Sequence, residues 1–438
     1  MPIAAVPNYL GQEFQTASPG LRFGMYLPLW GMNQRTKALS WDTHDIAYEV
    51  RGQQQQEREV KKENKVTALQ QACALSKHDK DTAKALFERQ NQTFATVAAA
   101  QGLRLQATAI APFTTGLGNE HPLENGFAFL NPYGLPYLPG SGVKGVLRQA
   151  ARELASGEWN ASDWRHSNDG NPRHEVQDPQ GKRLFDASDI DVLLGAEALD
   201  GKNHLRGVLS FWDVVPQIEG NSLMVDIMTP HQSHYYQQKD AAGSSSPHDS
   251  GSPNPISFLT VPPGSRFAFH VVCDSARLQH LAPDLAANGR WKVLLTEAFA
   301  HAFEWLGFGA KTSVGYGAMG RNVQAEEKLA RAQAEAQAAA DQAAKMDNLS
   351  DSAREIEVFV LACKTRLEQL RGGKDKPNTE LHAKARALSK AALEGADWSA
   401  EDKHSAAQAL ADWLPQVVAL DMKDERKKLK LAVLRGEA

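Results

Sequence analysis

Cysteine is scarce in this sequence, and its scarcity excludes two kinds of protein. Only three cysteines occur in 438 residues, Cys73, Cys273 and Cys363, and they lie far apart with no C-x-x-C spacing. This distribution excludes both a disulfide framework and a zinc site built from cysteines. The pattern is typical of a cytosolic protein.

Long apolar runs are missing as well. No stretch approaches the roughly 18 consecutive apolar residues that a membrane-spanning helix needs. The opening residues, MPIAAVPNYLGQEF, have no basic segment that leads into an apolar run, as a secretion signal would. We therefore expect a cytoplasmic protein with no membrane partner.

Neither sign of charge dominates. The net charge is −4 and the isoelectric point is near 6.4, which argues against a protein that coats nucleic acid with its whole surface. A local basic groove is still compatible with this balance, because attraction to phosphate decays over a Debye length of about 8 Å at physiological salt. Hydrophobic residues make up 42% and charged residues 23%, so the chain has the composition of a folded protein.

Composition changes along the chain predict three parts. Residues 1–102 begin with proline, glycine and aromatic residues and continue, from residue 46 to about 100, with Glu, Gln, Lys and Ala at helical spacing. We expect this part to be an N-terminal segment whose amphipathic helices pack on the core. Residues 103–322 mix strand and helix signals and predict an α+β core with insertions, and residues 323–438 predict an all-helical extension.

Within the core, strand and helix signals alternate. Residues 103–110 alternate apolar and polar side chains, and residues 208–215 and 267–272 have the apolar density of buried strands. Helices are expected just after Gly142 and over residues 291–306. Residues 156–183 read as a polar insertion, and residues 237–255 have the glycine, serine and proline content of a mobile loop.

The segment LPYLPGSGVKGVLRQAAR combines glycines with a helix start. Gly140, Gly142 and Gly145 allow a close approach of backbone, and Ser141 is the expected N-cap of the helix. The free N–H groups of such a helix end suit an anion, and Lys144 and Arg148 share a helix face beside it. The segment therefore predicts a phosphate contact, with an ordinary strand-to-helix turn as the alternative.

A second glycine-rich segment is LGFGAKTSVGYGAMG. Its glycines surround Lys311 and Thr312, so that amides, a cation and a hydroxyl occupy one short loop. It is not a P-loop, which would need glycine at Ala310, and it is not a dinucleotide fingerprint, which would need glycine at Thr312. The alternatives are a loop that holds a phosphodiester chain and a tight hairpin at the end of a domain.

The segment DIMTPHQSHYY offers aromatic and imidazole groups next to the long loop. His231, His234, Tyr235 and Tyr236 can stack on bases or contact phosphates. The two histidines have a spacing that could bind a metal, but no cysteine lies nearby to complete a site, so we expect a polar contact and no metal or other cofactor.

Catalysis by a serine nucleophile is disfavoured. Ser141 and Lys144 match the S-x-x-K pattern of penicillin-recognising enzymes. No S-D-N follows, however, and the KTS at Lys311 is not K-T-G.

Together, LPYLPGSGVKGVLR, DIMTPHQSHYYQ with PISFLTVPPGSRFAF, and LGFGAKTSVGYG resemble the RAMP superfamily of CRISPR proteins. Their order and spacing are most similar to the subunit-six family of type III-B (Cmr) effector complexes. The resemblance covers residues 103–321, more weakly the N-terminal part, and does not extend to the helical tail.

This resemblance implies a ferredoxin-like, RRM-related core and a noncatalytic, RNA-binding role in antiviral defence. It implies a place at the head of the Cmr backbone, beside the filament subunit four and subunit one, where the protein holds the 3′ part of the guide RNA and the target RNA. The implied contacts with RNA are Ser141, Gly142, Lys144, Arg148, Gly309, Lys311 and Thr312, with His231, Tyr235 and Arg266 as further candidates.

Two other functions stay open on the sequence. One is a RAMP endoribonuclease that processes CRISPR transcripts with His231 or His234 as general base, because imidazole can accept the proton of a 2′-hydroxyl near neutral pH. The other is an assembly protein whose binding contacts come from residues 326–438.

Overall fold

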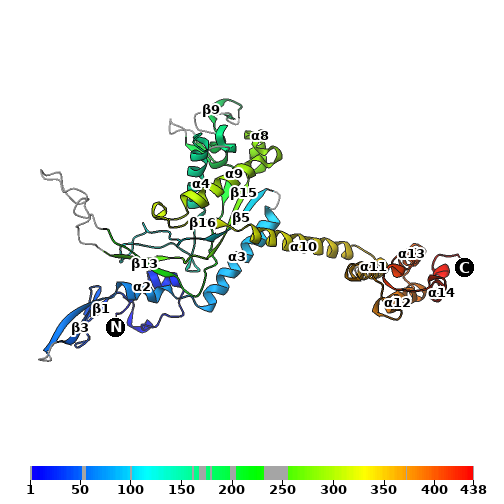
Figure 1. Cartoon of the computed structure of the whole chain (residues 1–438), viewed down its shortest axis with the longest axis horizontal. Helices are drawn as coiled ribbons and strands as arrows, with labels where there is room; N and C mark the ends of the chain where they lie inside the picture. The colour runs from blue at the N-terminus through cyan, green and yellow to red at the C-terminus, as the bar shows by residue number, and fades with distance from the viewer. Residues whose placement is uncertain are drawn as a thin grey trace. The chain divides into compact units, whose positions relative to one another are not determined.

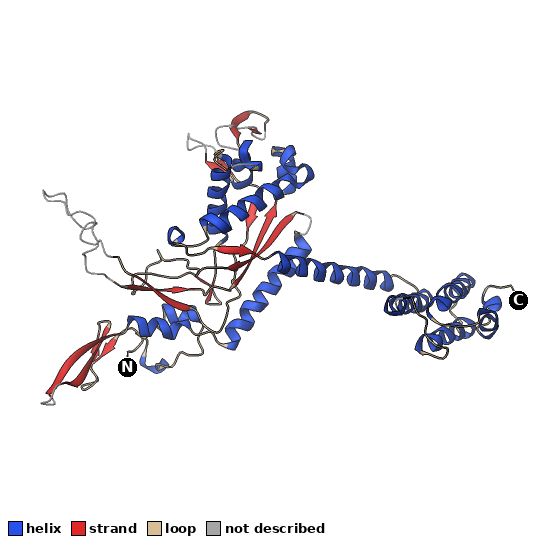
Figure 2. Cartoon of the chain, in the orientation of Figure 1, coloured by secondary structure: helices blue, strands red, loops and turns tan. Residues whose placement is uncertain are grey.

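The computed structural model describes residues 2–51, 56–98, 101–159, 162–166, 174–177, 180–197, 204–230, 255–370 and 372–437. The chain divides into two compact units, Met1–Lys328 and Leu329–Ala438. Figure 1 traces both units and Figure 2 separates their helices from their strands. The first unit mixes helices and strands, and the second is helical.

A four-stranded antiparallel sheet forms the centre of the first unit. Its strands are β5 (Gly102–Ala109), β12 (Leu209–Phe211), β15 (Arg266–Cys273) and β16 (Met319–Arg321), in the order β12-β15-β5-β16. Helix α4 (Gly140–Ala155) lies between β5 and β12 in the chain, and α9 (Arg290–His301) lies between β15 and β16. The core therefore alternates strand, helix, strand, strand, helix, strand. The strand predicted at residues 103–110 and the helix predicted at residue 291 are confirmed.

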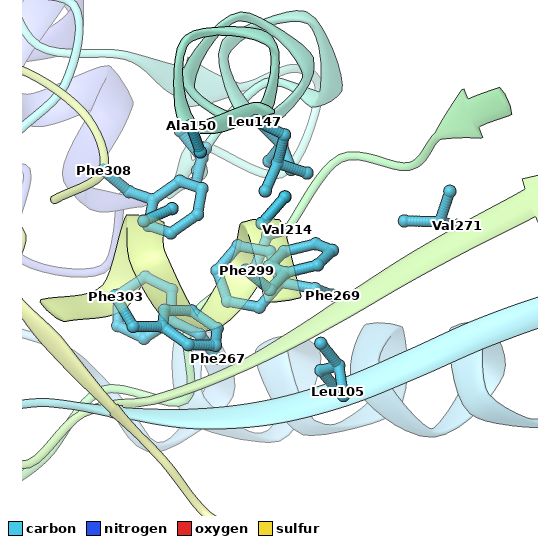
Figure 3. Packing of buried hydrophobic residues seen from close by; sticks show 14 of the residues in the cluster. Leu105, Leu147, Ala150, Val214, Phe267, Phe269, Val271, Phe299, Phe303 and Phe308 are labelled. Atoms are coloured by element: carbon cyan, nitrogen blue, oxygen red, sulfur yellow. The ribbon is translucent and has the colours of Figure 1, made fainter. Parts of the chain in front are cut away.

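Alternation along β5 and β15 decides which side chains face α4 and α9. Phe269 pairs with Leu105 across the two strands, and both side chains are buried on the same face. The Phe269 ring lies 5.3 Å from that of Phe299, 5.5 Å from Phe303 and 5.0 Å from Phe308. Figure 3 shows this aromatic group beneath Leu147 and Ala150 of α4. Aromatic packing of this density places the glycine-rich segment that follows Phe308 firmly on the sheet.

The opposite face of the sheet is covered by α3 (Lys77–Val97). His270 of β15 lies on this face, with its Nε2 3.2 Å from Asn91 Oδ1 and its ring 5.2 Å from that of Phe94. Burial lowers the pKa of His270 to about 3, so the imidazole is neutral in the folded protein. Because α3 packs on this face of the sheet, the side chains that the sheet presents there are not open for stacking on RNA bases.

Residues 44–63 correct the prediction of helices from residue 46. They form a hairpin of β3 (His44–Arg51) and β4 (Gln56–Glu63), and helices begin only with α2 (Lys65–Cys73) and α3. The composition is that of a helix, but the apolar residues Ile46, Tyr48 and Val50 follow the two-residue period of a strand. The ion pair between Lys62 and Glu49, at 3.1 Å, joins the two strands.

The remaining described elements of the first unit are short. Its two-stranded pairs are β1 (Gly31–Met32) with β2 (Leu39–Ser40), β6 (Phe129–Leu130) with β7 (Leu135–Pro136), β8 (His174–Gln177) with β9 (Arg183–Ala187), β10 (Ala196–Glu197) with β11 (His204–Leu205), and β13 (Met224–Met228) with β14 (Ile256–Thr260). Its short helices are η1 (Asn8–Leu10), α1 (Pro19–Gly24), η2 (Asp163–His166), α5 (Asp189–Leu194), α7 (Ser275–Leu281), α8 (Pro283–Ala286), η3 (Ala287–Gly289), η4 (Ala302–Leu306) and η5 (Thr312–Val314). The strand expected at residues 208–215 is limited to the three residues of β12.

The second unit confirms the helical character predicted for the C-terminal part. Its helices are α11 (Asp351–Leu370), α12 (Glu380–Glu394), α13 (Ala400–Val417), α14 (Met422–Lys428) and α15 (Leu431–Leu434), preceded by α10 (Val323–Asp347), which begins in the first unit. Phe359, Leu410 and Leu414 belong to a buried cluster of this unit's own residues. Among the described residues, no helix has both the length and the apolar character needed to cross a membrane.

Candidate nucleic-acid interface

Helix α4 begins three residues earlier than predicted, and Ser141 is not its N-cap. The helix starts at Gly140 after Pro139, and Ser141 and Gly142 are exposed in its first turn. Pro139 is suited to this place because its ring holds φ at −59° and it brings no N–H group that would need a partner. The amide of Gly140 donates to Asp213 Oδ1 at 2.7 Å. A carboxylate of the chain itself therefore satisfies the first amide of the helix end where the sequence predicted phosphate.

Arg148 reaches from α4 to the end of α5. Its Nη2 donates to the carbonyl oxygens of Leu194 at 2.6 Å and Gly195 at 2.5 Å. Cations at a helix C-terminus complement the partial negative charge of its free carbonyls. Arg148 thus joins α4 to α5, and this contact holds its guanidinium at a defined place.

A third cation completes a group that we call the α4 cation cluster: Lys144, Arg148 and Arg206. Burial lowers the pKa of Lys144, and the charges of Arg148 and Arg206 lower it further. Within the described part of the chain, no carboxylate contributes to this shift. Lys144 is therefore partly buried beside two like charges, an arrangement that disfavours its charged form and that a bound anion would relieve.

Arg206 was not among the residues singled out from the sequence. It directly follows β11, whose Leu205 pairs with Ala196 of β10, and it is exposed. This pairing places Leu205 next to Gly195, whose carbonyl oxygen accepts a hydrogen bond from the Arg148 guanidinium. No local pattern around Arg206 signals the cluster, because the strand pairing creates it.

The glycine-rich loop that follows Phe308 packs closely on the sheet. Gly317 has φ +73°, and a Cβ added there would lie 1.9 Å from the carbonyl oxygen of Phe308. Gly309 has φ +93°, and its Cβ would lie 2.2 Å from the carbonyl oxygen of Thr114. Both positions therefore need glycine for conformation and for space. The amide of Ala310 donates to Thr114 O at 2.8 Å, so part of the loop backbone expected to be free is bonded within the core.

The same loop is bound to the β13–β14 hairpin. The Tyr316 hydroxyl donates to Asp226 Oδ2 at 2.5 Å, and burial together with this carboxylate raises the pKa of Tyr316 to about 12. Lys311, with φ +59°, places its Nζ 2.7 Å from Met228 Sδ and 5.4 Å from the centre of the Phe258 ring. Among the described residues, a thioether and a ring are the contacts of the Lys311 ammonium, and neither carries a compensating charge. Two segments that were singled out separately thus meet, and Thr312 begins the short turn η5 beside Lys311.

Several predicted residues are placed elsewhere or fall outside the described ranges. Arg266 opens β15 on the α3 side of the sheet, where it lines a pocket with Lys80, Lys84 and Gln217, and so it does not join the α4 cation cluster. His231, His234, Tyr235 and Tyr236, and most of the loop predicted at residues 237–255, lie outside the described residues. The described residues therefore do not test the endoribonuclease alternative, which relies on His231 or His234 as general base.

One group of side chains in the described part of the chain could hold a metal ion, and it lies at the start of α5. His174, Asp189 and Asp284 each offer one atom, and these atoms lie within 4.8 Å of one another. His174 Nε2 lies 2.6 Å from Asp189 Oδ1, and both side chains are buried. A short buried contact of this kind is sufficient as a structural bond between β8 and the start of α5.

Comparisons with known proteins give the family of the core. A model of the RAMP superfamily matches residues 106–319, from within β5 to the first residue of β16. The protein named "CRISPR system Cmr subunit Cmr6" of Pyrococcus furiosus is 29% identical over 238 residues, which are 46% of this chain and 63% of the relative. The chain thus spans less than two thirds of the length of this curated relative.

Two solved structures were also matched. One is a type III-B Cmr-beta complex bound to cognate target RNA, with 16% identity, a TM-score of 0.35, and coverage of 56% of this chain and 66% of the matched one. The other is the crystal structure of Cmr6 from Pyrococcus furiosus, with 24% identity, a TM-score of 0.25, and coverage of 50% and 98%. The family match begins within β5 and ends at the first residue of β16. Its limits therefore coincide with those of the four-stranded core. The chain therefore carries a RAMP superfamily domain over residues 106–319.

Proposed function

We propose that the chain is a noncatalytic RNA-binding subunit of a type III-B CRISPR effector complex, in which it holds the 3′ part of the guide RNA and the target duplex at the head of the backbone. The RAMP domain and the name of the Pyrococcus relative support this assignment. The observation that carries the RNA-binding part of the proposal is the α4 cation cluster.

The position of Lys144 in the free protein is unfavourable for its charge. A partly buried ammonium next to two guanidinium groups loses hydration and is repelled by its neighbours. The bond of Arg148 to the end of α5 stabilises the fold, but among the described residues no carboxylate compensates the charge of Lys144. A phosphate placed among the three cations would convert the repulsion into charge-assisted hydrogen bonds. The repulsion among the three cations in the free protein is thus explained if the ligand is a polyanion.

Lys311 supplies a second contact in this proposal. The glycine-rich loop and the β13–β14 hairpin hold it in place through the Tyr316–Asp226 bond, and its own contacts leave its positive charge available. Phosphate contacts of this type are independent of sequence. A subunit that holds guides of different sequence needs such contacts, because base pairing between guide and target supplies the specificity.

The fold of the core, the surface that binds RNA and the neighbouring protein subunits are also part of the proposal. The order of elements and the strand order β12-β15-β5-β16 support a ferredoxin-like domain over residues 103–322, between an N-terminal segment and the helical extension. Since α3 covers the sheet face opposite α4, RNA would be bound at the α4 cation cluster and the glycine-rich loop. The protein neighbours in this proposal are the filament subunit four and subunit one, in the cytoplasm.

The test is affinity purification of the tagged chain from its host, with sequencing of the bound RNA and mass spectrometry of the bound proteins. Repeat-derived guide RNAs together with other Cmr subunits are the expected result. The triple variant Lys144→Ala, Arg206→Ala, Lys311→Ala should lose guide RNA relative to the wild-type chain. Recovery of the chain with neither guide RNA nor Cmr subunits would overturn the proposal.

A further inference from the structure

Two tryptophans lie together where α4 and α9 end. Trp305 belongs to η4, a π-helical turn that continues α9, and 60% of its surface is exposed. Trp159 follows α4, and the centres of the two ring systems lie 5.4 Å apart at an angle of 58°. Tryptophan is enriched among the residues that dominate binding energy at protein interfaces. An exposed, paired indole on a regular element is therefore a candidate contact.

Buried contacts with α4 and α9 hold the tryptophan pair in place. Trp159 packs edge-on against His301, with 4.4 Å between ring centres and an angle of 84°. His301 is buried, and its Nε2 lies 2.7 Å from Glu153 Oε2 on α4. The bond joins α9 to α4 beneath the indoles, so the platform exists before any partner binds. A preorganised contact loses less conformational entropy on binding.

Carboxylates surround this platform. Glu153 contacts His301, Glu297 accepts the amide of Asp163 at 3.1 Å, and Glu304 is exposed directly before Trp305. Burial and the charge of Asp163 raise the pKa of Glu297, so a nearby cation would stabilise this carboxylate. Arg152 of α4 and Arg165 of η2 lie on the same elements as Glu153 and Asp163, so the four acids of this region exceed its two arginines by two. The local field therefore repels RNA phosphates and attracts a positively charged group.

We propose that Trp305, Trp159 and the surrounding carboxylates form a docking surface for a protein neighbour that places an arginine or lysine side chain over the exposed indole. A cation over an indole face is the strongest of the cation–π pairs, and a carboxylate beside it adds a charged partner. The inference rests on the proposed function for the source of the neighbour, which is another protein subunit of the effector. It is independent of the α4 cation cluster and of Lys311.

The chain offers a matched control. Trp41 is 67% exposed and packs against a second tryptophan, Trp30, with ring centres 5.6 Å apart. Trp305→Ala and Trp41→Ala therefore remove the same exposed side chain from the same kind of pair. Since both indoles are mostly exposed, both variants should fold, which thermal unfolding would verify. Trp305→Phe keeps a ring at the docking surface.

The experiment measures binding of the labelled full-length chain to the host's type III-B effector assembled without this subunit. Trp305→Ala should bind at least about 30-fold more weakly than wild type, as for a hot-spot tryptophan, Trp305→Phe should lose less, and Trp41→Ala should bind as wild type. A benzoylphenylalanine placed at position 305 should crosslink to a protein segment that contains arginine or lysine.

Each other outcome is decisive. Wild-type affinity for Trp305→Ala, or a crosslink from position 305 to RNA, would overturn the docking surface while the proposed function stands. An equal loss for Trp41→Ala would also overturn it. If the wild-type chain does not bind the effector, the proposed function fails and the docking surface fails with it. RNA affinity of the isolated chain should be unchanged by Trp305→Ala, and a loss there would indicate base stacking in place of protein docking.

Discussion

Replacing Lys144 by methionine tests the α4 cation cluster through two effects of opposite sign. The substitution keeps an unbranched side chain of similar length and removes only the charge. If Lys144 contacts phosphate, RNA binding should lose one charge-assisted hydrogen bond, about 1.5–3 kcal/mol, which corresponds to a loss of affinity of about 10- to 150-fold. The loss should be the same for unrelated RNA sequences.

Stability should change in the other direction. Lys144 and Arg148 are like charges four residues apart on α4, and such pairs destabilise a helix by about 0.2–0.5 kcal/mol. Lys144→Met removes this repulsion and that from Arg206, so the free energy of unfolding should rise by about 0.5 kcal/mol. A side chain that weakens the free protein and strengthens the complex is the signature of a binding residue.

Lys84 provides the matched control. It is an exposed lysine on α3 that pairs with Glu88 four residues later, at 3.8 Å. Lys84→Met should leave RNA affinity unchanged and lower the free energy of unfolding by about 0.3 kcal/mol. Fluorescence anisotropy with two labelled RNAs at several salt concentrations measures affinity, and Lys144→Met should reduce the salt slope by about 0.7 for single-stranded RNA. Equal loss of affinity for both variants, or a destabilised Lys144→Met, would refute the reasoning.

Three further predictions concern the structure that supports the site. Gly317→Ala should destabilise the first unit by at least about 2 kcal/mol in urea unfolding, because its Cβ would clash with the Phe308 carbonyl, whereas Gly315→Ala, with φ +96° and open space, should cost only about 1 kcal/mol. Arg148→Met should cost about 1.5–3 kcal/mol, because it leaves the last carbonyls of α5 without their cation. His270 has a folded pKa of about 3, below its unfolded value near 6.5, so its contribution to stability is present above pH 6.5 and is lost as the pH falls toward 3. At pH 5 the loss should be about 2 kcal/mol, and His270→Gln should remove this part of the difference between pH 7 and pH 5.

Periodicity predicted the elements of the core well because local burial dominates there. The alternation in β5 and the three- and four-residue spacing of Val143, Leu147 and Ala150 in α4 reflect faces that must be buried whatever their partners are. The helical C-terminal unit is predicted for the same reason. Residues 44–63 show the limit of composition, since glutamate, glutamine and lysine occur there in a hairpin whose two strands stabilise each other.

The candidate site depended much more on contacts between distant parts of the chain. The helix end at Gly140 takes its carboxylate from Asp213, which no local capping pattern could reveal. Arg148, expected to face RNA, is bound to the end of α5, and Arg206 joins the cluster only because β10 and β11 pair. The family resemblance pointed to whole segments, and it could not assign a task to each side chain within them.

By itself the sequence determined the class of the protein: a folded chain without disulfides, an α+β core with RAMP motifs, and a helical tail. These properties depend on composition, on short-range periodicity and on glycines that only a tight backbone requires. The tertiary structure alone decided which cations lack a carboxylate partner in the described part of the chain and which of its indoles are exposed. Electrostatic and packing partners are chosen by proximity in space, and for Lys144, Arg206 and Trp305 that proximity arises only after distant segments have packed together.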